Sequence, residues 1–245
     1  MSIYPWIFSF LLFSTFSHAK VITPNGESLP WSMEGNIKVF HLIAEPIDIE
    51  FAPGLKVHCW GYNGHSPGPT IEATEGDRVR IVVTNHLPEE TTVHWHGILL
   101  PNSMDGVSGL NQPAIKPGDS FSYEFTLKQH GTYMYHSHFD EMVQIGMGMM
   151  GFIIIHPKEN TYPVDRDFAL MLHEWFIPPG ASVPNPLVMT DFNYFTFNGR
   201  VYPGSEPLVV KKGERVRIRL GNLSMDTHPI HLHGYAFTVT ALGGW

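Results

Sequence analysis

The sequence predicts an all-β protein built from two related Greek-key domains, barrels or sandwiches, of which the second is truncated. Short stretches of alternating apolar and polar residues recur along the chain, separated by turns that draw on 23 glycines and 20 prolines. No segment shows an amphipathic helical period over three turns. A block of sequence also recurs at a fixed offset, which indicates two copies of one structural unit.

The repeated block ends in paired histidines. Segment 94–97 (His-Trp-His-Gly) corresponds to segment 231–234 (His-Leu-His-Gly), because 231 − 94 = 137 and 233 − 96 = 137. The same offset relates segment 76–81 (Gly-Asp-Arg-Val-Arg-Ile) to segment 213–218 (Gly-Glu-Arg-Val-Arg-Ile). Each copy is therefore expected to run as turn, strand, turn and strand, and to end in His-x-His-Gly.

Strands are expected where apolar residues alternate or form short buried runs, and Gly- or Pro-containing pairs such as Asn63-Gly64 and Pro117-Gly118 mark the turns between them. Segment 161–165 is expected to link the two units. The expected strands are 37–51, 57–62, 70–73, 78–85, 91–99, 120–127, 132–138, 152–156, 168–175 and 235–241.

The domain boundaries follow from these elements. A complete first domain is expected over 37–158, a partial second domain over 159–245, and an N-terminal arm over 20–36. Residues 1–19 are expected to be a signal peptide, because segment 7–16 is apolar and Ser17-His18-Ala19 fits a cleavage site. The protein is then exported, to the periplasm or outside the cell. The segment before the apolar run has no Lys or Arg, so a membrane anchor is the alternative.

Composition excludes several classes of function. The net charge of −8 and the lack of a basic cluster argue against nucleic acid as a partner. A single cysteine, Cys59, excludes an intrachain disulfide and a cysteine-rich zinc site. We expect Cys59 to be a small buried hydrophobe.

A third histidine pair, His136 and His138, strengthens a metal-binding interpretation. Side chains at positions i and i+2 of a strand share a face, with Cα atoms roughly 6.5–7 Å apart. That spacing suits two imidazoles that bind two neighbouring metal ions, since paired metal centres lie about 3.5–4 Å apart. One such pair alone is more often satisfied by hydrogen bonds in a core, but three pairs favour metal ligands.

Over about residues 37–245 the sequence resembles the multicopper oxidases, specifically the laccase-like branch built from two cupredoxin domains. The gap between the third and the last histidine motif, 228 − 138 = 90 residues, favours two domains over three. The segments that carry the resemblance are 63–71, 94–97, 104–107 (Met-Asp-Gly-Val), 131–138 (Gly-Thr-Tyr-Met-Tyr-His-Ser-His) and 228–234 (His-Pro-Ile-His-Leu-His-Gly).

The resemblance implies copper as the cofactor and assigns roles to seven histidines. His94 and His231 would bind the type 2 copper, and His228 would be the first ligand of the type 1 blue copper. The carboxylate of Asp105 would help to move protons to oxygen, although an ordinary Asp-Gly turn is an equal alternative. The type 3 pair would be bound by His96, His136, His138 and His233.

The sequence departs from the family in its blue-copper ligands. Thr91 stands where the repeat has His228, and Ser137 stands where a blue-copper cysteine would sit. The family completes its sites with a His-Cys-His segment, a further His and an axial Met, and none of these follows in the sequence given. We therefore expect an incomplete product of a longer gene, which by itself is colourless and lacks oxidase activity.

The first functional hypothesis is an oxidoreductase that takes single electrons from a small reducing substrate, a phenol or a metal ion, and reduces oxygen to water. The resemblance implies a copper cluster between domains and, in the two-domain branch, between the subunits of a homotrimer. The alternative is an exported copper-binding or copper-tolerance protein without oxidase activity. A copper nitrite reductase is disfavoured, because that family carries its blue-copper Cys where this chain has Ser137.

The methionines that follow the third histidine pair allow two interpretations. Thioethers are soft ligands that could bind cuprous ion. Flexible side chains that fill gaps beside the cluster are the interpretation we favour. The residues are Met142, Met147, Met149 and Met150.

Overall fold

The computed structural model describes residues 18–244. The predicted signal peptide lies outside the described residues, apart from His18 and Ala19. Within the described part of the chain, no helix has the length and apolar character needed to cross a bilayer.

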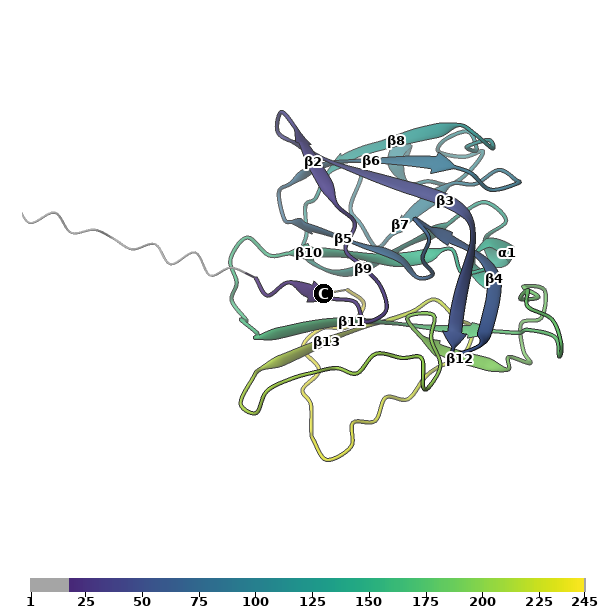
Figure 1. Ribbon diagram of the computed structural model, residues 1–245. Helices are drawn as coiled ribbons and strands as arrows, with labels where there is room; N and C mark the ends of the chain where they lie inside the picture. The colour runs from purple at the N-terminus through teal and green to yellow at the C-terminus, as the bar shows by residue number, and fades with distance from the viewer. Residues whose placement is uncertain (1–17, 245) are drawn as a thin grey trace, which may run out of the picture.

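Strands dominate the fold, with one short α-helix and one short 3-10 helix in the described range (Figure 1). The elements are β1 (Val21–Ile22), β2 (Trp31–Glu34), β3 (Ile37–Ala52), β4 (Leu55–Tyr62), β5 (Gly68–Thr74), β6 (Arg78–Asn85), β7 (Val93–His96), η1 (Asn102–Met104), β8 (Ser120–Thr126), β9 (Gly131–Ser137), α1 (Glu141–Gly146), β10 (Met150–His156), β11 (Arg166–Trp175), β12 (Tyr194–Phe197) and β13 (Val216–Asn222).

Three sheets lie above one another as layers in Figure 1. The upper sheet has the order β2-β3-β6-β8, with β4 paired to the second half of the long strand β3. The middle sheet has the order β5-β10-β9-β7, and the lower sheet centres on β11 with neighbours β1, β12 and β13. The upper and middle sheets form the first unit, and the lower sheet belongs to the second.

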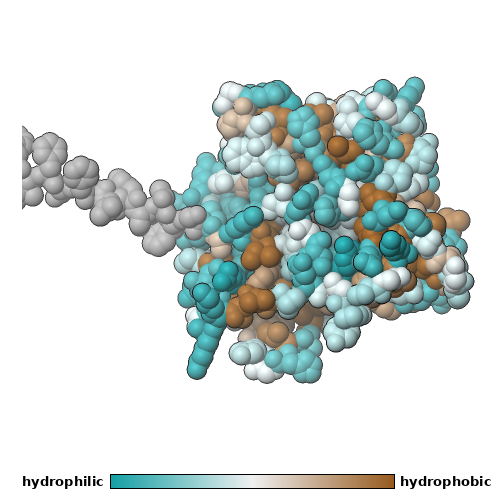
Figure 2. Space-filling view, in the orientation of Figure 1, coloured by the Kyte–Doolittle hydropathy of each residue, from teal (hydrophilic) through white to brown (hydrophobic). Residues whose placement is uncertain are grey.

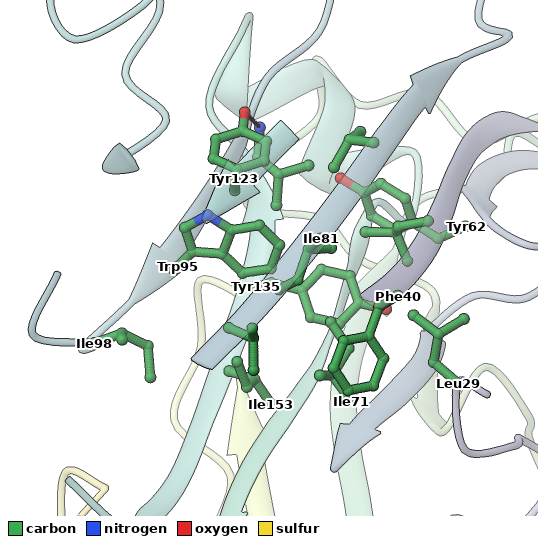
Figure 3. Close-up of a cluster of buried hydrophobic side chains, with 14 of the residues drawn as sticks. Leu29, Phe40, Tyr62, Ile71, Ile81, Trp95, Ile98, Tyr123, Tyr135 and Ile153 are labelled. Carbon is green, nitrogen blue, oxygen red and sulfur yellow. Dashed lines mark hydrogen bonds between the residues drawn. The ribbon is translucent and has the colours of Figure 1, made fainter. Parts of the chain in front are cut away.

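The core of the first unit lies between its two sheets. Trp95 of β7, Tyr123 of β8 and Tyr135 of β9 are fully buried there and point toward one another in Figure 3. The Tyr123 hydroxyl accepts a hydrogen bond from the Val93 amide at 3.0 Å, which fixes the first residue of β7. The alternation of β7 thus places Trp95 in the core and leaves the two flanking histidines on the opposite face.

Strand β10 joins the two units, because both of its faces are buried. Ile153 and Ile155 contribute to the core of the first unit, whereas Phe152 and Ile154 pack with Met171 of β11 in a second apolar cluster. A strand that is apolar on both faces is expected in a layer covered on both sides. Apolar packing of β10 against β11 therefore helps to hold the units together.

The N-terminal arm connects the layers and contains two short strands. Its strand β1 pairs in parallel with β11. Thr23 hydrogen-bonds Thr70 of the middle sheet at 2.7 Å, side chain to side chain, and Asn198 donates to the Pro24 carbonyl at 3.0 Å. The arm is thus bonded to both units.

The internal repeat is visible in the strand pairing. Strand β6 pairs in parallel with β3, and its counterpart β13 pairs in parallel with β11. The strand expected at 235–241 is absent from the structure, so that expectation was wrong. In the first unit β7 is held by backbone pairing with β9, and residues 223–244 have no pairing of that kind within the described chain.

The second unit exposes much of its apolar surface. On β13, Val216, Ile218 and Leu220 are exposed although they alternate as core residues do. Figure 2 shows brown hydrophobic side chains in several places on the face turned to the viewer.

Candidate metal centre

Two antiparallel strands bring the first-domain histidines together. The register of β7 and β9 sets His94 opposite His136, with Val93 opposite Ser137 and Trp95 opposite Tyr135. Because alternate residues of a strand share a face, His94 and His96 lie on the same side as His136. Directly opposed residues in an antiparallel pair have Cβ atoms about 4.5–5.5 Å apart, which is within the range that a bound ion can bridge.

The geometry of these rings suits a metal site. One nitrogen from each of His94, His96 and His136 lies within 4.8 Å of the other two. His96 Nδ1 and His136 Nε2 are 3.3 Å apart. The ring of His138 is outside this set but close, with its centroid 5.4 Å from that of His94 and 6.3 Å from that of His136. We call His94, His96, His136 and His138 the four-histidine group.

Backbone carbonyls orient two of the rings. His94 Nδ1 lies 2.7 Å from the Asp105 carbonyl oxygen, and His136 Nδ1 lies 2.9 Å from that of Ser137. A ring that donates its Nδ1 hydrogen to a carbonyl presents Nε2 with its lone pair, which is the tautomer that binds metal. Both rings are therefore fixed in the form that a metal ligand needs.

Burial favours the neutral form of two rings of the group, those of His96 and His136. Desolvation lowers the pKa of His136 to about 4, and the neighbouring histidines add to that effect. The pKa of His96 is lowered as well, first by burial and then by His94. Neutral imidazole is the form that binds metal, and imidazole is a good donor for copper. The donor set of the four-histidine group thus fits copper.

Asp105 lies against His94 through both its backbone and its side chain. It follows the 3-10 helix η1, and its Oδ1 is 3.4 Å from His94 Nδ1. The next residue, Gly106, has φ +86°, and a Cβ there would approach the Val93 carbonyl oxygen to 1.9 Å. The chain bends at Asp105, and only a glycine fits at the next position, which leaves the Asp105 carboxylate beside the His94 ring.

Glu141 is a second carboxylate at the group, which the sequence did not point to. Its oxygens lie 3.7 Å from His136 Nδ1 and 3.8 Å from His138 Nε2. It is the first residue of α1, three residues beyond His138. The spacing of three residues from His138 was the one hint of this contact in the sequence. It does not say how residues 139–141 fold, so the contact could not be predicted.

The remaining predicted ligands form a separate set in the second unit. The rings of His231 and His233 have centroids 4.8 Å apart and are exposed, and these residues are not on a strand. His228 Nε2 lies 3.0 Å from Ser224 Oγ and 3.0 Å from a carboxylate oxygen of the buried Glu174. The structure thus groups four of the seven predicted histidines, and the joining of His231 and His233 to them stays a prediction.

A polar cluster surrounds Thr91, the residue of the first unit that corresponds to His228 in the repeat. Thr91 and Ser137 both donate to Oε1 of the buried Gln144, Thr91 at 2.7 Å. The Gln144 amide donates to the Glu89 carboxylate at 2.7 Å and to the Glu90 carbonyl at 2.8 Å. Because Ser137 stands between His136 and His138, this network fixes the end of β9. Gln144 was not singled out in the sequence.

The Gln144 network gives a prediction for stability. Gln144→Leu should lower the free energy of unfolding by about 2–3 kcal/mol, because it leaves buried hydroxyl groups and a carboxylate without their partner. Urea denaturation measures this change. Gln112→Leu is the matched control, since Gln112 is also buried but bonds the Pro113 carbonyl, at 3.3 Å, and the Tyr123 hydroxyl, and has no carboxylate partner. Equal losses in the two variants would contradict a special role for Gln144.

Cysteine and methionine behave mainly as packing residues. Cys59 is buried in β4, and desolvation raises the pKa of its thiol to about 12, which disfavours a thiolate ligand. Met147, Met149 and Met150 are buried, as expected of side chains that fill gaps. Met142 is exposed and differs from the other three.

Comparison with known proteins gives the family. Residues 44–160 and 178–244 each match a multicopper oxidase model. Copper resistance protein A of Escherichia coli is 46% identical over 137 residues, which cover 56% of this chain and 22% of that protein. The multicopper oxidase MmcO of Mycobacterium tuberculosis is 31% identical over 240 residues, which cover 83% of this chain and 46% of that protein. The chain thus spans less than half the length of these curated relatives.

A solved structure supports the same assignment. A crystal structure of a multicopper oxidase matches with a TM-score of 0.69 and 32% identity, over 82% of this chain and 68% of that one. The predicted all-β fold with cupredoxin-like units is confirmed by this likeness and by the strands of the chain. The chain belongs to the multicopper oxidase family, which implies copper binding.

Proposed function

We propose that the chain is the copper-binding part of an oxidoreductase that couples one-electron oxidation of a reducing substrate to the reduction of oxygen to water. The observation that carries this proposal is the four-histidine group, in which three ring nitrogens lie within 4.8 Å of one another. Copper, when bound, would accept single electrons and pass them to oxygen. The chain's own residues bind and orient the metal and hold protons.

Each predicted ligand has a role in this proposal. His94 serves the type 2 copper together with His231. The Asp105 carboxylate, 3.4 Å from His94 Nδ1, holds a proton for transfer to oxygen. His228 is the first ligand of the type 1 copper. His96, His136, His138 and His233 serve the type 3 pair.

The cluster is proposed to be completed between copies of the protein. His231 and His233 are exposed in the second unit, where they are available to another subunit. A homotrimer places the second unit of one copy against the first unit of the next. The partners are then oxygen and a small reducing substrate, a phenol or a metal ion. The protein is exported, to the periplasm or beyond.

A second candidate is supported by the relatives. Two proteins named copper resistance protein A and one named as a homolog match 56% of this chain at 39% to 46% identity. An exported copper-binding or copper-tolerance protein without oxidase activity would use the same histidines to hold copper. The two candidates differ in what happens to oxygen.

Oxygen uptake separates the two candidates. The copper-loaded product of the complete gene, with its blue-copper ligands, should consume oxygen when a phenol or cuprous ion is added, and the His94→Ala variant of that product should not. Copper binding without oxygen uptake above the variant's rate would favour the tolerance protein. Failure to bind copper would contradict both.

Asp105 gives a prediction for the oxidase. Asp105→Asn keeps the size and the backbone carbonyl that His94 contacts, so copper content should stay unchanged. The kcat for oxygen reduction should fall about 10²- to 10⁴-fold, the usual contribution of a positioned acid or base. Steady-state oxygen electrode measurements test this. Asp119→Asn, at an exposed carboxylate, should leave kcat unaltered. An equal fall of kcat in both variants would contradict a role of Asp105 in proton transfer.

A further inference from the structure

A cavity of about 360 Å³ lies between the two units, beside the four-histidine group. On the first unit it is lined by His96, His136 and residues of α1. On the second unit it is lined by His173 and Glu174 of β11 and by parts of segments 185–192 and 222–225. Three methionines, Met142, Met189 and Met225, line it as well.

His173 is an unusual residue in this cavity. Its side chain is buried, and neither ring nitrogen has a hydrogen-bond partner within the described chain. Its ring packs against that of Trp175, with centroids 4.5 Å apart. Buried polar atoms without partners are rare in folded proteins, and an ion or a water molecule is the usual explanation for them.

The other donors in the cavity lining indicate which kind of ligand fits. Met142 and Met225 are more than half exposed and lie at the rim, whereas His173, at 4% exposure, lies at the floor. Thioether sulfur and neutral imidazole are soft ligands that favour cuprous ion over hard cations. Glu141 and Glu174 add negative charge, and the lining contains neither Lys nor Arg. A cation is therefore favoured over an anion or a neutral molecule.

We propose that this cavity binds a soft monovalent cation, cuprous ion in the cell, through the imidazole of His173 and the thioethers of Met142, Met189 and Met225. None of these four donors belongs to the predicted copper cluster, so the site does not rest on the proposed oxidase function. The shared cavity places the bound cation next to His96 and His136. It is then stored beside the four-histidine group.

Silver ion, a redox-inert soft cation, is the probe. The full chain is labelled with ¹³C at the methionine methyl groups in a Cys59→Ala background, which removes the only thiol. Silver should shift the methyl signals of Met142, Met189 and Met225 together, with saturation near one equivalent. The methyl of Met33, an exposed methionine on β2, should not move in that range. A common response of Met33 and the cavity methionines would overturn the site.

His173→Phe tests the floor of the cavity. The substitution keeps a ring of similar size and removes two buried nitrogens that have no partners, so the unfolding free energy should stay equal or rise. The silver affinity should nevertheless fall at least about tenfold, the range seen when metal-site residues are changed. Unchanged affinity would overturn the proposal. The double variant Met142→Leu and Met225→Leu, at exposed positions, should also lower the silver affinity.

The proposed oxidase and this site are distinguished by His94→Ala. That variant removes a ligand of the four-histidine group but none of the cavity donors. It should keep the methyl shifts and the silver affinity of the parent. If the shifts disappear in His94→Ala, the silver is bound by the histidine group and the separate site is wrong.

Discussion

Replacing His94 with alanine should lower the copper affinity of the protein by more than about a hundredfold, since even loss of a residue that only supports a ligand costs ten- to a hundredfold. His94 supplies one of the three ring nitrogens that lie within 4.8 Å of one another, and its Nδ1 is already committed to the Asp105 carbonyl. The ring is half-buried, so its removal leaves the core formed by Trp95 intact. Competition against a cupric chelator measures the affinity.

The loss should be specific to histidines of the group. His136→Ala, which removes the ring opposite His94, should give the same loss of copper. His86→Ala is the matched control, because His86 is exposed and lies at the end of β6. Copper content that falls equally in the His86 variant, or that stays at the parent value in His94→Ala, would show that the metal is bound elsewhere.

The sequence predicted the parts of the fold that depend on local periodicity and on repetition. Strand β6 and its counterpart β13 were expected from one repeated block, and both take a parallel partner. The i, i+2 spacing of His94 and His96 correctly predicted a shared face on β7. The placement of these two histidines on one face therefore followed from a short motif whose geometry is set by the strand itself.

Features that depend on tertiary register could not be predicted. Nothing in the segments around His94 and His136 says that these residues stand opposite each other, because register is decided by packing of whole faces. Glu141 and Gln144 join the site through α1, a helix of one to two turns with too little periodicity to recognise. The pairing of β1 with β11 likewise links residues about 146 positions apart along the chain.

The interface around β10 explains why His173 had no signal in the sequence. In a strand with alternating polarity a histidine would be expected to face solvent, but β11 is covered on the side of Met171 by β10. The residues of β11 are therefore buried by the contact between the two units, and the alternation of residues along β11 does not reveal that contact. The same contact creates the cavity beside the four-histidine group.

Buried histidines should make the metal-free protein much less stable in mild acid. Desolvation lowers the pKa of His136 to about 4 and that of His173 to about 3, against an unfolded value of 6.5. Between pH 6.5 and these values the unfolded chain binds more protons than the folded one, so stability is full above pH 6.5 and is lost as the pH falls. From pH 6.5 to 5 each histidine should cost about 1.6 kcal/mol, because the loss reaches about 1.4 kcal/mol per pH unit only once the pH is well below 6.5.

Together the two residues should lower the unfolding free energy by about 3 kcal/mol over this window, a large part of the 5–15 kcal/mol of a typical domain. Urea denaturation in the presence of a metal chelator, at pH 6.5 and pH 5, measures it. His173→Phe should remove about half of this loss, because the contribution of His136 remains. His130→Phe, at an exposed ring, should leave it unchanged. The lowered pKa values of Glu124 and Glu214 keep those carboxylates charged between pH 6.5 and pH 5. An unfolding free energy that stays the same at the two pH values would mean that His136 and His173 are not buried as described.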